Sequence, residues 1–217
     1  MRNESDQFEL QRRRMVESQI ALRGIRDPRV LEAMRKVPRH VFCGGNYDEA
    51  YADYPLQIGC GQTISQPYIV ALMTELLRLA GQERVLEVGT GSGYQAAILC
   101  ELASEVYSVE RYPELAESSQ RRLENLGYHN VHVHAGDGTL GWPEHAPYDR
   151  IIVTASSPRI PPSLTDQLAD GGVLVIPVGG RAMQTLTVVT RKGEVLNEES
   201  SIPCTFVKLI GREGWEE

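Results

Sequence analysis

A short apolar run that leads straight into three closely spaced glycines restricts the fold of this chain most strongly. Residues 84–94 read RVLEVGTGSGY, and their first five residues, rich in branched apolar side chains, predict a buried β-strand. The spacing of apolar residues after Tyr94 predicts a helix beyond the glycines. Strand, glycine turn and helix in this order are typical of a parallel α/β sheet, where the N–H groups of the loop and the helix dipole can meet a ligand. The alternative is a tight turn that needs only the positive φ of glycine.

The chain beyond residue 82 repeats this alternation of strand and helix. Short β-rich apolar runs predict strands at 105–109, 131–134, 150–154 and 173–178. Helical patterns lie between the strands at 94–103, 113–126 and 163–169. We therefore expect an α/β fold with a doubly wound, Rossmann-like sheet that is mostly parallel and has helices on both faces. A turn at Lys192 and Gly193 separates two further β-rich runs, which predicts antiparallel strands at the C-terminal end of the sheet.

The first 60 residues do not follow this alternation. A helix is predicted over 8–22, with Gly24 as its stop, and a second over 28–37, with Asp27 as its N-cap. Residues 40–61 show no periodicity and are expected to be ordered but irregular, before Pro67 opens another helix. A chain of 217 residues, of which 41% are hydrophobic, predicts one large domain. In this domain, 1–60 would form a helical and irregular cover, and 61–217 the cofactor-binding and catalytic core.

Charge and cysteine usage exclude several classes of function. The net charge is −7 and no long Lys/Arg run offsets it, so nucleic acid is not expected as a partner. No apolar run approaches the ~20 residues that cross a bilayer, and the polar start of the chain lacks a signal sequence, so we expect a cytoplasmic protein without membrane contact. The four cysteines form no C-x-x-C pair, which argues against a zinc site or a disulfide framework, and no metal is expected.

Acidic residues at the ends of the predicted strands indicate which ligand the glycine loop binds. The spacing is G-x-G-x-G rather than the G-x-G-x-x-G that suits a dinucleotide pyrophosphate, and Glu87 precedes the loop. A carboxylate beside a pyrophosphate is unfavourable, whereas S-adenosylmethionine has no phosphate and carries an ammonium and a sulfonium. Glu110 ends the second strand, where a carboxylate can accept hydrogen bonds from both ribose hydroxyls. Asp137, between two glycines, is a candidate for the adenine amino group, with a simple turn residue as the alternative.

The absence of a base indicates the kind of methyl acceptor. Residues 154–158 (TASSP) lack the Asn/Asp-Pro-Pro-aromatic motif that binds the amino groups of nucleobases. They also lack the Pro-Cys pair that attacks a pyrimidine ring. The five histidines show no obvious pairing with a nucleophile. An oxygen or nitrogen nucleophile that must lose a proton usually needs a base, whereas a carboxylate is already ionised at neutral pH. Carboxyl methylation then needs mainly alignment and desolvation of the two opposite charges.

Residues 59–73 (GCGQTISQPYIVALM), followed by the glycine loop, resemble the protein-L-isoaspartate O-methyltransferase family. The loop alone identifies only the wider methyltransferase superfamily, whereas TISQP at 63–67 is specific to this family. The resemblance covers roughly residues 12 to 210 and continues in RGIRDPRVLEAM at 23–34, KVPRH at 36–40, AYAD at 50–53, GDG at 136–138 and LADGGVLVIPVG at 168–179.

The resemblance implies methyl transfer from S-adenosylmethionine to the free α-carboxyl of L-isoaspartyl residues in damaged peptides and proteins, with S-adenosylhomocysteine as product. The ester then closes to a succinimide, part of which reopens to normal aspartate. The resemblance also implies that Ser65 is the active-site serine, whose uncharged hydroxyl can orient the substrate carboxylate without quenching it. Without the resemblance, Ser65 would be interpreted as a helix-capping residue ahead of Pro67.

The predicted site takes residues from both halves of the chain. Ser65 is the candidate catalytic residue. The candidate cofactor-binding residues are Gln62, Thr63, Ile64, Ser65, Glu87, Gly89, Thr90, Gly91, Gly93, Glu110, Arg111, Asp137 and Gly138. The family recognises the peptide backbone, which implies that the substrate-binding residues are Ser65, Thr154, Ala155, Phe206 and Val207.

Two positions depart from the family pattern. Residues 206–209 read FVKL where the family has an aromatic-Val-Pro-Leu run, and Cys60 replaces a common Tyr. Lys208 is then either an attractor for the substrate carboxylate or a solvated strand-end lysine. These departures concern peptide preference rather than the chemistry.

Other functions stay open at this point. The expected partners are isoaspartyl-containing peptides and proteins, and a monomer is expected. A methyltransferase of the same fold could act on another small carboxylate or hydroxyl, and a non-catalytic S-adenosylmethionine-binding interaction protein could share the loop. A nicotinamide-dependent dehydrogenase is disfavoured by the glycine spacing and by Glu87.

Overall fold

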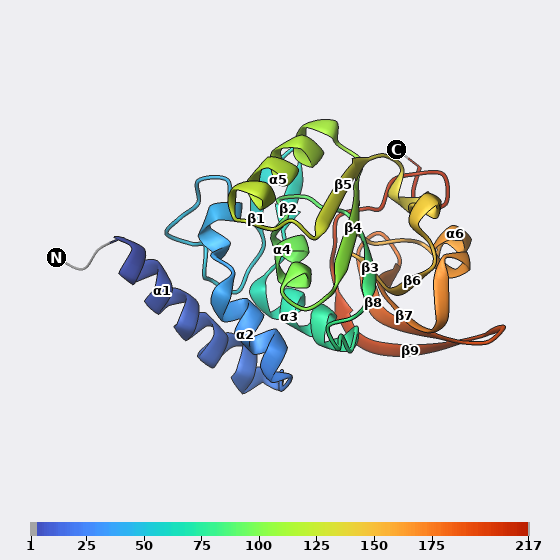
Figure 1. The fold of residues 1–217 in the computed structure, drawn as a ribbon, viewed down its shortest axis with the longest axis horizontal. Coiled ribbons are helices and arrows are strands. Elements are labelled where there is room, and N and C mark those ends of the chain that lie inside the picture. Colours follow the sequence, from blue (N-terminus) through green and yellow to red (C-terminus); the bar gives the residue numbers. More distant parts are fainter. Residues whose placement is uncertain (1–3, 217) are drawn as a thin grey trace.

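The computed structural model describes residues 4–216 and has a seven-stranded sheet at its centre (Figure 1). The strands lie in the order β5-β4-β3-β6-β7-β8-β9. Their bounds are β3 Arg84–Val88, β4 Glu105–Glu110, β5 Val131–Ala135, β6 Tyr148–Val153, β7 Leu168–Gly179, β8 Gln184–Lys192 and β9 Val195–Cys204. Neighbours from β5 to β7 are parallel, whereas β8 is antiparallel to both β7 and β9. This confirms the predicted parallel sheet with antiparallel C-terminal strands.

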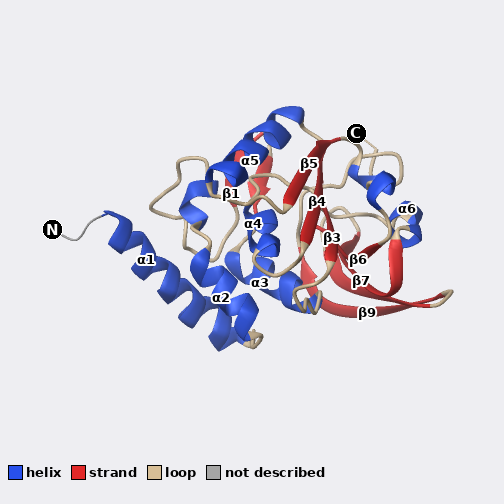
Figure 2. Cartoon of the chain, in the orientation of Figure 1, coloured by secondary structure: helices blue, strands red, loops and turns tan. Residues whose placement is uncertain are grey.

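Both faces of the sheet are buried because successive strand residues point to opposite sides. Val85 belongs to one hydrophobic cluster and Leu86 to the other, and Ile152 and Ile151 divide in the same way. Figure 2 shows the larger helices on one side of the sheet and α6 on the other. The helices of the larger layer are α1 Glu4–Arg14, α2 Pro28–Lys36, α3 Pro67–Leu76, α4 Tyr94–Cys100 and α5 Pro113–Asn125, and α6 spans Pro162–Asp166.

The N-terminal helices share the core of the larger layer. Helix α1 continues through a π-helical turn, Met15–Ile20, and a 3-10 turn, Ala21–Arg23. The run stops at Gly24, whose φ of 102° is left-handed, as the sequence predicts. Met15 is buried in the same cluster as the sheet residue Val85, so this region packs as part of the main core.

The expectation of an irregular segment over 40–61 is wrong at its C-terminal end. Strands β1 (Leu56–Gly59) and β2 (Gln62–Ile64) form a hairpin, and a 3-10 turn spans Arg39–Phe42. The two strands have four and three residues, and only Leu56 and Ile64 in them are buried. Strands this short leave no visible alternation of apolar and polar residues in the sequence. The hairpin turn has positive φ at three consecutive residues, including 50° at Cys60, which is unusual for a residue other than glycine.

Two predicted helices are also too long. Helix α4 ends at Cys100 rather than at residue 103, and α6 ends at Asp166. Leu168 pairs with Tyr148 instead and starts β7 earlier than the predicted residue 173. At the end of α6, strand pairing therefore overrides the local helical pattern, as tertiary contacts often do.

Candidate active site

The glycine loop after β3 is built around a close approach to Thr154. Gly89 has a φ of 98°, and its N–H donates to the carbonyl of Val109 at 2.8 Å. A Cβ on Gly89 would overlap Oγ1 of Thr154, which donates to the carbonyl of Gly89 at 2.6 Å. Only glycine satisfies both the backbone angle and this contact. Gly93 has a different role, because its missing Cβ admits Ser119 and Leu123 of α5.

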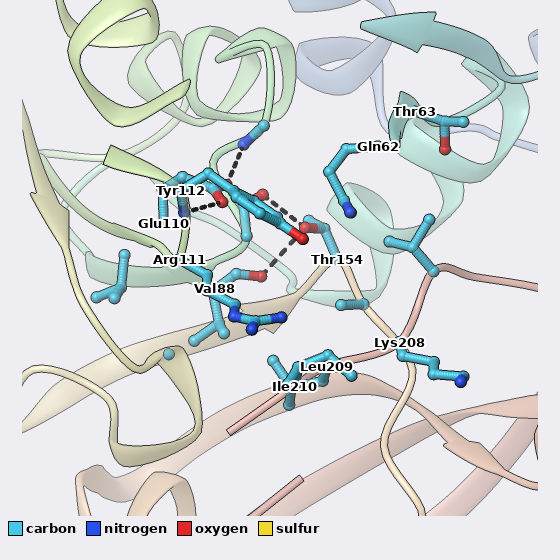
Figure 3. Close-up of a pocket in the computed structure, with 16 residues that line it drawn as sticks. Gln62, Thr63, Val88, Glu110, Arg111, Tyr112, Thr154, Lys208, Leu209 and Ile210 are labelled. Atoms are coloured by element: carbon cyan, nitrogen blue, oxygen red, sulfur yellow. Dashed lines mark hydrogen bonds between the residues drawn. The ribbon is translucent and has the colours of Figure 1, made fainter. Parts of the chain in front are cut away.

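Glu110 stands at the end of β4 with its carboxylate facing the loop. One oxygen accepts the backbone N–H of Gly91 at 2.8 Å, and the other accepts that of Tyr112 at 3.0 Å (Figure 3). Each carboxylate oxygen can accept a further hydrogen bond. Glu110 is therefore fixed in position and keeps acceptor capacity for two hydroxyl groups of a ligand.

Three adjoining cavities surround the loop. The first, the glycine-loop cavity, is lined by Gln62, Thr63, Val88, Gly89, Gly91, Val109, Glu110, Arg111, Tyr112, Gly138, Thr154, Ala155, Val207, Lys208, Leu209 and Ile210 (Figure 3). The second, the Ser65 cavity, is lined by Arg23, Pro55, Thr63, Ser65, Gln66, Tyr68, Ile69, Thr154 and residues 202–207. The third, the connecting cavity, includes Ile64, Ser65, Gly89, Thr90, Gly91 and Phe206.

Two threonines on opposite walls join these cavities. Thr63 from β2 and Thr154 from the end of β6 line all three of them. Ser65 lines the second and third, and Val207 lines the first and second. Most of the predicted cofactor and substrate residues thus come together, with the hairpin on one side and the sheet on the other.

The hydroxyl of Ser65 has no hydrogen-bond partner within the described residues. Helix α3 begins after Gln66, which makes no side-chain cap, and Asp53 accepts the N–H of Tyr68 at 2.9 Å instead. The helix-capping interpretation of Ser65 is therefore not what the structure shows. The half-buried hydroxyl is free to bind a ligand in the Ser65 cavity.

Glu87 lies beneath the loop rather than on a cavity wall. Its side chain is fully buried, and one oxygen accepts the hydroxyl of Ser108, whose oxygen also lies 2.5 Å from Oγ1 of Thr90. The other carboxylate oxygen has no hydrogen-bond partner among the described residues. Burial raises the pKa of Glu87 to about 8. Its predicted contact with a cofactor stays a prediction, and any effect from this position would act through the loop or through its charge.

Asp137 is largely engaged by the chain itself. One oxygen accepts both the N–H of Thr139 at 2.9 Å and its hydroxyl at 2.6 Å, and the other accepts the N–H of Arg212 at 2.8 Å. Gly211 is required here because a Cβ would overlap the same carboxylate. Asp137 thus anchors the C-terminal segment, and its predicted bond to adenine is untested by this geometry.

Asp53, Arg23 and Tyr112 are among the residues at the site that were not predicted. Asp53 caps α3, forms an ion pair with Arg23 and lies 3.3 Å from the side-chain amide of Gln66. The guanidinium of Arg23 also lies 3.5 Å from the ring centroid of Tyr68. Both Asp53 and Arg23 fall inside motifs quoted above, but no spacing rule links residues so far apart in sequence. Tyr112 follows the acidic end of β4 and was not signalled by any motif.

Over residues 4–216, no group of three or more His, Cys, Asp or Glu side chains is placed to hold a metal ion. None of the helices in that part of the chain combines the length and the apolar character that crossing a bilayer requires.

Comparisons of sequence point to one family. The family model for protein-L-isoaspartate(D-aspartate) O-methyltransferase matches residues 10–214. A protein-L-isoaspartate O-methyltransferase of Syntrophus aciditrophicus (strain SB) is 56% identical over 214 residues, covering 97% of this chain and 98% of that protein. One from Methanoregula boonei is 59% identical over 207 residues and covers 95% of each chain.

Solved structures agree with the sequence comparisons. A protein-L-isoaspartate O-methyltransferase superposes with a TM-score of 0.84 at 29% identity, covering 93% of this chain and 67% of that one. A Plasmodium falciparum protein described as such an enzyme, solved with S-adenosyl-L-homocysteine, gives 0.79 at 26% identity, covering 92% and 98%. The chain therefore belongs to the protein-L-isoaspartate(D-aspartate) O-methyltransferase family.

Proposed function

We infer that the protein transfers a methyl group from S-adenosylmethionine to the free α-carboxylate of L-isoaspartyl residues in damaged peptides and proteins. The observation that carries this inference is the junction at Thr63 and Thr154, where a cavity with the features of a cofactor site meets one that holds a free serine hydroxyl. Family membership supports the same activity. S-adenosyl-L-homocysteine in the Plasmodium falciparum relative supports the choice of cofactor.

The residues of the glycine-loop cavity fit S-adenosylmethionine. Glu110 is buried and has acceptor capacity to spare, which suits a ribose diol. The glycines Gly89, Gly91 and Gly138 line the same cavity and present backbone rather than side chains to a ligand. When bound, the cofactor supplies an electrophilic methyl group on a sulfonium. The walls formed by Val88, Val109 and Leu209 exclude water, which strengthens the attraction between that cation and an arriving carboxylate.

The Ser65 cavity fits the acceptor. A carboxylate with an ordinary pKa is ionised at neutral pH and needs no base, only orientation. The Ser65 hydroxyl would donate a hydrogen bond to one carboxylate oxygen while the other oxygen faces the junction at Thr63 and Thr154. Phe206 and Val207 would hold the peptide backbone along the wall. The methyl ester then closes to a succinimide, part of which reopens to normal aspartate.

Three finer points belong to the same proposal. Residues 1–60 act as a cover whose Arg23 and Pro55 line the Ser65 cavity, and 61–217 form the cofactor-binding and catalytic core. The protein acts as a monomer, without nucleic acid or membrane as a partner. Its cytoplasmic location would suit the four cysteines, all of which are free in the structure.

A paired-peptide assay tests this function. An isoaspartyl peptide and its normal aspartyl twin are offered with cofactor that carries a radiolabelled methyl group. Base-labile label on the isoaspartyl peptide alone is the expected result. Equal labelling of the twins, or label on neither while a small carboxylate or hydroxyl compound is methylated, would overturn it. Tight cofactor binding with no turnover on any acceptor would instead indicate a binding protein.

A further inference from the structure

The segment that follows β9 presents Lys208 on the wall of the glycine-loop cavity. Lys208 forms a parallel bridge with Ser156. The N–H of Ser156 donates to the carbonyl of Val207 at 2.7 Å, and the N–H of Leu209 donates to the carbonyl of Ser156 at 2.8 Å. Val207 and Leu209, on either side of Lys208, thus make both hydrogen bonds to Ser156. The N–H and C=O groups of Lys208 itself therefore point away from Ser156. Within residues 4–216 the backbone N–H of Lys208 has no hydrogen-bond partner, so it can donate to a second extended chain.

The side chain of Lys208 is a cation without a partner in the described part of the chain. It is exposed, it lines the glycine-loop cavity, and it extends away from Glu110 and Arg111 (Figure 3). Arg23, the cation of the Ser65 cavity, differs because Asp53 holds it in an ion pair. An unpaired ammonium at the rim can attract an anion at no cost to an existing contact.

The surrounding charge makes this position selective. The whole chain has a net charge of −7, which disfavours acidic peptides at long range. Val207, the residue before Lys208, lines both the glycine-loop cavity and the Ser65 cavity. A peptide bound in the Ser65 cavity therefore lies against the segment that carries the ammonium.

We propose that Lys208 is a specificity-determining residue, which favours isoaspartyl peptides that carry an acidic side chain one or two residues from the isoaspartyl position and donates its backbone N–H to a peptide carbonyl. This inference rests on the proposed function and adds a substrate preference to it. Exposed ion pairs of this kind shift affinity by about 2- to 5-fold, and salt screens them. Because the contact is the same before and during methyl transfer, KM changes while kcat does not.

The test of the side chain uses two isoaspartyl peptides of equal length that differ only by Glu or Gln beside the isoaspartyl residue. Wild type and Lys208→Arg are expected to show a KM about 2- to 5-fold lower for the Glu peptide at low salt, a preference that disappears in 0.5 M NaCl. Lys208→Gln is expected to treat both peptides alike. Lys192→Gln, an exposed charge change at the β8–β9 turn, is the matched control and should keep the preference. A preference that survives in Lys208→Gln, or is absent from wild type, overturns the proposal.

The test of the backbone compares Lys208→Pro with Lys208→Gln, because both lack the cation and only proline lacks the N–H. Proline here removes no hydrogen bond that the structure records, so unfolding temperature and cofactor affinity should match those of Lys208→Gln. The KM for both peptides is expected to be about 3-fold higher than in Lys208→Gln. Equal KM values overturn this part. In the wild-type protein, bound peptide is also expected to slow hydrogen exchange at the backbone amide of Lys208. An unchanged exchange rate contradicts this part.

The dissociation constants of the two peptides, measured by fluorescence anisotropy, separate this inference from the proposed function. A preference for the Glu peptide in binding without any isoaspartyl methylation would reject the function and keep the role of Lys208. Methylation of both peptides with equal dissociation constants would support the function and reject the role of Lys208.

Discussion

The carboxylate of Asp53 accepts the backbone N–H of Tyr68 at 2.9 Å, so a residue fifteen positions earlier in the chain caps helix α3. The same carboxylate holds Arg23 in an ion pair. This arrangement takes over the role that a serine just before the helix would ordinarily have. The hydroxyl of Ser65 is thereby left without a partner within the described residues.

Removal of this cap is expected to destabilise helix α3. Asp53→Ala should lower the free energy of unfolding by about 1 kcal/mol, because an orphan N–H at the start of a helix loses its acceptor. Asp53→Asn keeps an acceptor oxygen and should lose less. Chemical denaturation measures both values, and Asp48→Asn, on the exposed surface, is the control. An Asp53→Ala protein as stable as wild type would contradict the capping role.

Ser65→Ala is expected to reduce turnover without affecting the fold. The hydroxyl has no partner in the described chain, so its loss should leave the unfolding temperature unchanged. Turnover of isoaspartyl peptide should fall by at least ~10-fold, while the dissociation constant of the cofactor stays nearly the same. Ser18→Ala, at an exposed position of the N-terminal helical region, is the control. Weakened cofactor binding with normal turnover would assign Ser65 to the other cavity.

Glu110→Ala is expected to show the opposite pattern. Loss of charge-assisted hydrogen bonds to the ribose should weaken cofactor binding by roughly 1–3 kcal/mol, measured by calorimetry. The N–H groups of Gly91 and Tyr112 also lose their acceptor, so the loop should become less ordered. Glu110→Gln retains acceptor capacity and should lose less affinity. Glu144→Ala, exposed and outside the three cavities, should bind normally.

Glu87 should make the stability of the protein fall as the pH rises. Burial raises its pKa in the folded state to about 8 from an ordinary value of 4.5. Between these values the folded protein holds a proton that the unfolded chain has released, so the free energy of unfolding decreases with pH across this window. Glu87→Gln has no carboxyl group to titrate. Its free energy of unfolding, relative to that of wild type, should therefore rise by at least about 1 kcal/mol from pH 5 to pH 9.

Denaturation curves at pH 5, 7 and 9 check this difference. Glu117→Gln, on the exposed face of α5, should give curves parallel to wild type throughout. A constant difference between Glu87→Gln and wild type at all three values would show that the carboxyl does not titrate in this range.

The positions of the strands along the chain and of the glycine loop could be predicted because each depends on short-range patterns. Branched apolar runs mark β3 and β4, and the acid at the end of β4 follows the loop at the expected separation. The Thr63–Ser65 segment was found only through its resemblance to a family. Its local sequence predicts a cap, and nothing nearby indicates that Asp53 performs that task.

The parts that could not be predicted depend on contacts between distant residues. The β1–β2 hairpin is held by one buried pair, Leu56 and Ile64, which leaves no periodic signal. Asp137 has the motif of a ligand residue, yet its carboxylate also binds the amide of Arg212 from the far end of the chain. Such pairings are set by the packed sheet, and a single sequence contains no local record of them.

The C-terminal residues form a wall of both cavities, and this has a consequence for synthesis. Val207, Leu209 and Ile210 line the glycine-loop cavity, and they leave the ribosome after every strand of the sheet. A domain generally folds as a unit rather than strand by strand. The crevice is therefore complete only after residues 207–210 have been synthesised and have bonded to Ser156.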